Sequence, residues 1–269
     1  MAKNFWIVDT FSENAFHGNP AAVFFVDHLD DDVLLQNVAM EINTPETIFV
    51  KKLENGDFEA LCFTPYSKGL YFGNGLFAAA KVINSQNPDL KEFKIIVGIR
   101  VFLINILENG SIRIRFSTVS INKVPMPASL NAALDDEIVV SIAESKEELI
   151  VEIRSPKRLF NLEPNIDILK NIDYNSFIIT ADTHYEQDVD YDFCAKVFAP
   201  RLGIFSDIIT PIAYAKLAAY WSDRIEKTEL IGFQSSLNRS GYVNINYGEE
   251  FTYLTGYCSI STEGSMLVF

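Results

Sequence analysis

The chain has 269 residues, of which 48% are hydrophobic and 22% are charged, so it can bury one large core or two of moderate size. Its formal net charge of −14 argues against nucleic-acid binding, because a phosphate backbone has to be neutralised by Lys and Arg side chains. The three cysteines, Cys62, Cys194 and Cys258, form no CxxC pair and no metal-ligand spacing, which predicts buried reduced thiols and no metal site.

The first half of the chain predicts strands mixed with two helices. Alternating or continuous apolar runs indicate strands, Asn-Gly pairs between them indicate hairpin turns, and acids in a first turn favour a helix. The expected elements are strands at 5–11 and 19–26, a helix at 30–42, a hairpin at 47–65 turning at Asn55-Gly56, a helix at 74–86, and a hairpin at 99–116 turning at Asn109-Gly110.

The sequence predicts neither a signal peptide nor a membrane-spanning segment. The N-terminus lacks the long apolar segment of a signal peptide, and the most apolar stretch, 95–107, is interrupted by Gly98, Arg100 and Asn105. We therefore expect no membrane partner and a cytoplasmic protein.

The second half of the chain repeats the plan of the first. Residues 117–134 are partly polar and aperiodic, which is typical of a crossing between domains. After it, 163–180 repeats the helix, turn and strand of 30–50, and 191–221 repeats the strand, loop and alanine-rich helix of 58–83. The sequence thus predicts two similar α+β domains related by a pseudo-twofold, with a ligand bound between them.

In this arrangement the N-termini of the two matched helices become candidate binding sites for a carboxylate. Free N–H groups and the positive end of the helix dipole favour an anion there, and Gly73-Asn74-Gly75 allows a close backbone approach at the first helix. At the second helix, Asp207 precedes Thr210, a candidate N-cap, and Pro211, which suits the first helical position. Gly-Asn-Gly is also a common turn and Thr-Pro a common helix start, so a purely structural interpretation stays open.

Glu46 lies between a proline turn and an apolar strand in TPETIFV. A solvated carboxylate paired with Lys51 or Lys52 is one interpretation. If the side chain faces the interdomain cleft instead, burial suits it to proton transfer. The histidines fit no catalytic or metal pattern, and neither a P-loop nor a dinucleotide fingerprint is present.

The segments VDTFSENAFHGNPAAVFF, INTPETIFV, FTPYSKGLYFGNGLFAAA and FAPRLGIFSDIITPIAYAKLAAYW together resemble the PhzF-like family of phenazine-biosynthesis isomerases over nearly the whole chain. The resemblance implies a fold similar to diaminopimelate epimerase, with two α+β domains, each a curled β-sheet around a central helix. We place these domains at 1–118 and 119–262, with a last strand at 263–269 that can return to the first domain. The resemblance further implies a cofactor-independent enzyme that moves a proton on a small substrate, and a homodimer.

Carried over residue by residue, the resemblance assigns Glu46 as the catalytic acid/base. It places Asn19 in the Gly-Asn-Pro turn near the cleft, Gly73 at the first helix, and Asp207 before the second helix. Asn74, followed by Gly75, stands where the family usually has a histidine, and an amide cannot exchange protons near neutral pH.

At the second helix, Pro211 and Ile212 replace a Gly-Ser pair of the family, so a backbone donor and a hydroxyl are lost together. Neither helix start carries a cysteine, which argues against two-thiol racemisation.

Two hypotheses follow. The chain is an isomerase in which Glu46 alone transfers the proton on a carboxylate-bearing substrate, or it is a catalytically degenerate relative that acts as a binding or structural protein. A thiol enzyme using Cys62 is a remote third, since a small core residue within a strand is the simpler interpretation.

Overall fold

The computed structural model describes residues 2–69, 73–134, 138–184, 189–202, 204–207, 210–236 and 239–267. The chain divides into two compact units, unit 1 with Met1–Phe116 and Tyr253–Phe269, and unit 2 with Ser117–Thr252. The chain leaves unit 1 at the end of β7 (Ile112–Ser117) and returns within β16 (Phe251–Gly256). This division differs from the expected boundary at 262, because β16 pairs with β7 and β17 (Cys258–Met266) pairs along its length with β1 (Lys3–Thr10).

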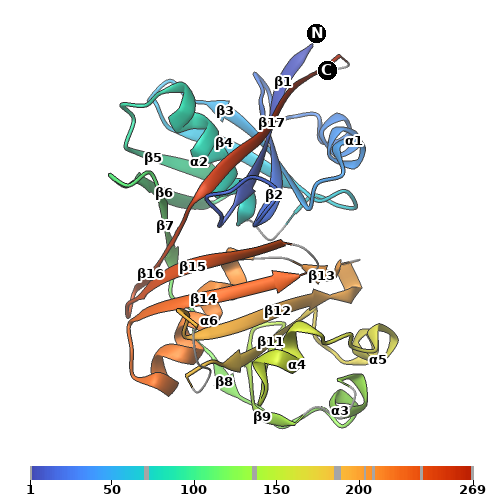
Figure 1. Ribbon diagram of the computed structural model, residues 1–269. Helices are drawn as coiled ribbons and strands as arrows, with labels where there is room; N and C mark the ends of the chain where they lie inside the picture. The colour runs from blue at the N-terminus through green and yellow to red at the C-terminus, as the bar shows by residue number, and fades with distance from the viewer. Residues whose placement is uncertain are drawn as a thin grey trace. The chain divides into compact units, whose positions relative to one another are not determined.

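In its described residues, unit 1 is a mixed sheet with two helices. Its remaining elements are β2 (Asn19–Phe25), α1 (Asp32–Ile42), β3 (Glu46–Lys52), β4 (Phe58–Phe63), α2 (Asn74–Gln86), β5 (Glu92–Val97) and β6 (Arg100–Ile106). β1 and β2 are antiparallel, β2 and β3 parallel, β3 and β4 antiparallel, β4 and β5 parallel, and β5 and β6 antiparallel. Both expected hairpins form, through β3–β4 and through β6–β7. β1 and β17 run side by side near the two termini (Figure 1).

The helix α2 is the central element of unit 1. It packs against β1, β2, β3 and β17, and its residues from Asn74 to Ala80 are all buried. A helix that is apolar on every side is stable only when it is covered on every side, and the alanine-rich sequence makes a thin helix that the curled sheet can enclose. The opposite face of the sheet packs against α1 through Ala22, Phe24 and Phe49.

Unit 2 repeats this plan. Its elements are β8 (Asn122–Lys123), α3 (Leu130–Ala133), β9 (Val139–Ser145), β10 (Glu148–Ile153), α4 (Pro156–Phe160), α5 (Ile166–Asn171), β11 (Ser176–Asp182), β12 (Phe193–Ala199), η1 (Pro200–Leu202), β13 (Ile204–Asp207), α6 (Pro211–Ile225), β14 (Glu229–Ser236) and β15 (Arg239–Tyr247). From β9 to β12 the pairs are antiparallel, parallel and antiparallel, followed by parallel β12–β14 and antiparallel β14–β15. This is the order of pairings found in unit 1, so the repeat and the predicted α+β fold class are confirmed.

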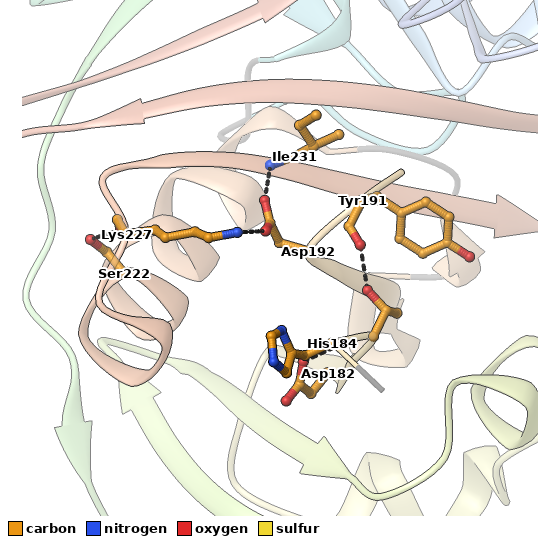
Figure 2. Close-up of polar contacts among 8 residues, drawn as sticks. Asp182, His184, Tyr191, Asp192, Ser222, Lys227 and Ile231 are labelled. Atoms are coloured by element: carbon orange, nitrogen blue, oxygen red, sulfur yellow. Dashed lines mark hydrogen bonds and ion pairs between the residues drawn. The ribbon is translucent and has the colours of Figure 1, made fainter. Parts of the chain in front are cut away.

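The parallel pair β12–β14 depends on Asp192, which directly precedes β12. Its carboxylate accepts a hydrogen bond of 2.8 Å from the Ile231 backbone N–H and pairs with Lys227 Nζ at 2.6 Å (Figure 2). His184, which the sequence left without a role, lies nearby, where its backbone N–H donates to Asp182 (Figure 2). The contacts of Asp192 thus join the start of β12 to β14. The contact of His184 with Asp182 involves none of the predicted site residues.

Among the described residues, no helix is both long and apolar enough to cross a lipid bilayer.

A row of polar and charged side chains joins α6 to β10. Lys216, Tyr220 and Arg224 follow one another at intervals of four residues, which places them on one side of the helix. Lys216 forms an ion pair with Glu148, while the Tyr220 hydroxyl donates to Glu152 and Arg224 pairs with the same carboxylate at 2.7 Å. Burial lowers the pKa of Lys216 to about 8. The Lys216–Glu148 pair fixes the register of α6 against the sheet, since its two buried charges have to meet away from water. Arg224 is exposed, so its pair with Glu152 contributes less.

Replacing Lys216 by Met should leave Glu148 as a buried unpaired carboxylate and lower the free energy of unfolding by about 3–5 kcal/mol. The double variant Lys216→Met/Glu148→Leu should recover most of this loss, because no charge is left to desolvate. Urea denaturation followed by circular dichroism measures both. As a control, Lys227→Met removes a half-exposed pair with Asp192 and should cost about 1 kcal/mol or less. A double variant as unstable as the single one would contradict the assignment.

Candidate functional site

Glu46 is the first residue of β3, and the turn before it explains its position. α1 ends at Ile42 because Asn43 adopts a left-handed conformation with φ of 55°, which closes the helix. Thr44 then donates its hydroxyl to the Glu46 carbonyl at 2.9 Å, and the strand begins. The Glu46 residue is only 7% exposed, so the interpretation as a solvated carboxylate is wrong.

The Glu46 carboxylate is held by the N-terminus of α2. Its Oε2 accepts a hydrogen bond of 2.9 Å from the backbone N–H of Gly75, the second residue of that helix. A Cβ at position 75 would lie 3.0 Å from Ile48 Cβ and 3.3 Å from Glu46 Cδ, which only glycine avoids without displacement. Gly73 is the N-cap residue of the same helix. The free N–H groups and the positive end of the helix dipole therefore face a carboxylate, as a helix N-terminus favours.

Asn74, between these two glycines, is a buried neutral group in the first turn of α2. It is 3% exposed, and its Oδ1 has no hydrogen-bond partner among the residues that the structure describes. A buried amide oxygen without a protein partner is costly, and a ligand that donates a hydrogen bond would satisfy it. The amide can bind a ligand, but it cannot take a proton from it.

Asn19 lies on the same face and at the same edge of the sheet as Glu46. β2 and β3 are parallel with Ala21 opposite Glu46, and Asn19, two residues earlier, points to the side of Ala21. Asn19 is fully buried, and its carbonyl accepts from the Thr10 hydroxyl at 3.0 Å. Gly18 precedes it with φ of 62°, where a Cβ would lie 2.0 Å from the Thr10 carbonyl oxygen. The turn thus requires glycine and delivers Asn19 to the edge at which Glu46 begins its strand.

The site residues predicted in the second half belong to unit 2. Pro211 and Ile212 begin α6, and Thr210 is its N-cap residue as predicted, although the Thr210 hydroxyl makes no capping hydrogen bond. Asp207 is the last residue of β13, and its side chain lies outside the described structure. Phe72, which the sequence places before the first helix, lies outside the described residues as well. The meeting of the two helix ends in one cleft stays a prediction.

Cys62 was predicted only as a core residue, but the structure places it near Glu46. Cys62 is directly opposite Ile48 in the β3–β4 hairpin, and Ile48 is two residues after Glu46. Burial raises the pKa of the Cys62 thiol well above its usual value, and the nearby charge of Glu46 raises it further. The sequence could have predicted this proximity, because the length of the Asn55-Gly56 turn sets which residues of β3 and β4 face each other.

Within the described ranges, no group of three or more His, Cys, Asp and Glu side chains is arranged to hold a metal ion.

Replacing Gly75 by Ala tests the close approach of α2 to β3. Alanine favours an ordinary helix position by about 1 kcal/mol, whereas here its Cβ forces the helix away from Ile48 and Glu46. We expect a net loss of about 1–3 kcal/mol in the free energy of unfolding, typical of overpacking. Urea denaturation measures the change, and a variant more stable than the parent protein would show that the helix end has room for the methyl group.

Comparison with known proteins places these residues in a family. The sequence pattern of the PhzC-PhzF family, described as phenazine biosynthesis-like protein, matches residues 8–264. An uncharacterized isomerase of Halalkalibacterium halodurans is 28% identical over 258 residues, which cover 95% of each chain. The mouse phenazine biosynthesis-like domain-containing protein 2 is 30% identical over 266 residues and aligns with 91% of this chain and 92% of its own length.

A solved structure from this family has the same fold. The crystal structure of a PhzF family protein of Enterococcus faecalis superimposes with a TM-score of 0.90 over 100% of both chains, at 24% sequence identity.

Proposed function

Because the chain belongs to the phenazine biosynthesis-like PhzC-PhzF family, we propose that it is an isomerase in which Glu46 transfers a proton between two carbon atoms of a small carboxylate-bearing substrate. The curated relative from Halalkalibacterium halodurans is named an isomerase, which supports the reaction class. The observation that carries the proposal is the burial of Glu46 against the N–H of Gly75. A charge is desolvated at a helix N-terminus there, in a position that stability alone does not require.

A single carboxylate is sufficient for such a shift. The Glu46 carboxylate takes a proton from one carbon, and the electron pair of the broken C–H bond moves into the conjugated system of the substrate. Glu46, now protonated, returns the proton to a second carbon on the same face, so that no proton or electron is gained or lost overall. The acid and the base are the same group, and no redox cofactor enters this balance.

The neighbours of Glu46 bind and orient the substrate. The N–H groups of the first turn of α2 and the dipole of that helix favour a substrate carboxylate, and the amides of Asn74 and Asn19 offer donors and acceptors. In unit 2 we assign Asp207 and the start of α6, at Pro211 and Ile212, to the same substrate. Proline supplies no N–H and isoleucine is apolar, so this end of the substrate should be less polar than its carboxylate.

The second candidate is a binding protein that has lost catalysis. Asn74 favours it, because a buried amide replaces the proton-transferring histidine that the family usually carries. The retained Glu46 and its contact with Gly75 favour catalysis. In heavy water, an isomerase would introduce carbon-bound deuterium into the acid, whereas a binding protein would leave the acid unlabelled. This difference distinguishes the two candidates. A homodimer in the cytoplasm, implied by the family, stays a prediction.

Exchange with heavy water tests the proposed function. The protein is incubated in D₂O with cyclic and acyclic amino and hydroxy acids, and mass spectrometry measures carbon-bound deuterium. The parent protein should label at least one acid, and Glu46→Gln should lower the rate about 100-fold or more, since an amide accepts no proton.

Glu54→Gln provides the matched control, because Glu54 is an exposed glutamate in the turn between β3 and β4. It should label at the parental rate. Equal labelling by the parent protein and Glu46→Gln would rule out the assigned role of Glu46.

A further inference from the structure

Cys62 lies diagonally across from Glu46 on the face of the sheet that packs against α2. In the antiparallel pair β3–β4 it is directly opposite Ile48, and Glu46 points to the same side as Ile48. Diagonal neighbours in adjacent strands lie within reach of each other's side chains. Cys62 is 1% exposed, so the thiol has to find its partner within the protein.

The position of Gly75 brings the two side chains together. The point that a Cβ of residue 75 would occupy lies 3.3 Å from Cys62 Sγ and 3.3 Å from Glu46 Cδ. The thiol and the carboxylate therefore both lie against Gly75, whose backbone N–H already donates to Glu46 Oε2. The other two buried thiols differ from Cys62, because Cys194 donates to the Ala181 carbonyl and Cys258 to the Phe77 carbonyl, each at 3.8 Å.

We propose that Cys62 is a positioning residue for the proton-transfer group, its thiol donating a hydrogen bond to the Glu46 carboxylate. This inference rests on the proposed function of Glu46. Together the thiol and the Gly75 N–H restrict the rotation of the carboxylate and hold it in one orientation. A proton-transfer group held in a fixed orientation loses less conformational entropy at the transition state.

The chemistry of the thiol fits a donor and excludes a nucleophile. Burial and the negative charge of Glu46 raise the pKa of Cys62 well above its usual value, so the thiol keeps its proton at neutral and mildly alkaline pH. A cysteine attacks as the thiolate, which this environment disfavours. A donor that stays protonated while its carboxylate neighbour alternates between charged and neutral forms favours the charged form, from which the reaction starts.

Infrared spectroscopy of the S–H stretching band tests the contact without any substrate. The band that disappears in Cys62→Ala identifies this thiol, and Cys258→Ala identifies the band of a thiol bonded to a backbone carbonyl. The Cys62 band should lie at lower frequency than the Cys258 band, because a charged acceptor forms the stronger hydrogen bond. In Glu46→Gln it should move toward the Cys258 band, whereas Glu54→Gln should leave it in place. A Cys62 band that Glu46→Gln does not move would overturn the proposal.

Deuterium exchange tests the consequence for catalysis. Cys62→Ala should lower kcat about tenfold with little change in KM, because the carboxylate is then no longer held in the orientation for proton transfer. Cys62→Ser should restore at least part of the rate, since a hydroxyl also donates. A Cys62→Ala variant as fast as the parent, or a Cys62→Ser variant as slow as Cys62→Ala, would reduce Cys62 to a core residue. If the parent protein labels no acid, the proposed function fails, and the infrared measurement still decides the contact.

Discussion

The backbone of α2 meets the side of β3 without an intervening side chain, and the rest of the unit 1 site depends on this approach. Gly75 alone makes it possible, since a methyl group there would lie 3.0 Å from Ile48 and 3.3 Å from Glu46. The approach aims a helix N–H at a strand carboxylate, buries that carboxylate and brings the Cys62 thiol against both. The missing side chain of Gly75 thus lets a backbone N–H stabilise a buried acid directly.

The two units share a plan and differ in chemistry. The first residue of the parallel-paired strand is Glu46 in β3 and Ser176 in β11. Each unit encloses one alanine-rich helix, yet α2 begins with glycines and free N–H groups, whereas α6 begins with Pro211. Unit 2 places its buried charges further along its helix, at Lys216 and its partners, where they hold α6 in register. A repeated fold therefore fixes where helix and strand ends lie, and single residues decide which end carries chemistry.

Asn74 is the clearest departure from the family pattern. It is buried in the first turn of α2, beside the residue that binds Glu46, and its Oδ1 has no partner within the described residues. An amide in this position can recognise a ligand but cannot transfer a proton near neutral pH. Under the proposed function, this departure removes one proton-transferring group and keeps the positive end of the α2 dipole. We therefore expect the substrate to differ from the family more than the reaction class does.

Local sequence determined most of the elements. The helix predicted at 74–86 has the bounds of α2, Glu46 begins its strand as expected, and Asn55-Gly56 and Asn109-Gly110 turn the hairpins. These features depend on neighbours a few residues apart, so periodicity and turn chemistry reveal them. Only the tertiary structure decided that Glu46 is buried, that Gly75 binds it and that Cys62 lies beside it. Those contacts join residues on different strands and a helix. The Asn55-Gly56 turn sets the register between β3 and β4, whereas the docking of α2 against these strands has no local pattern in the sequence.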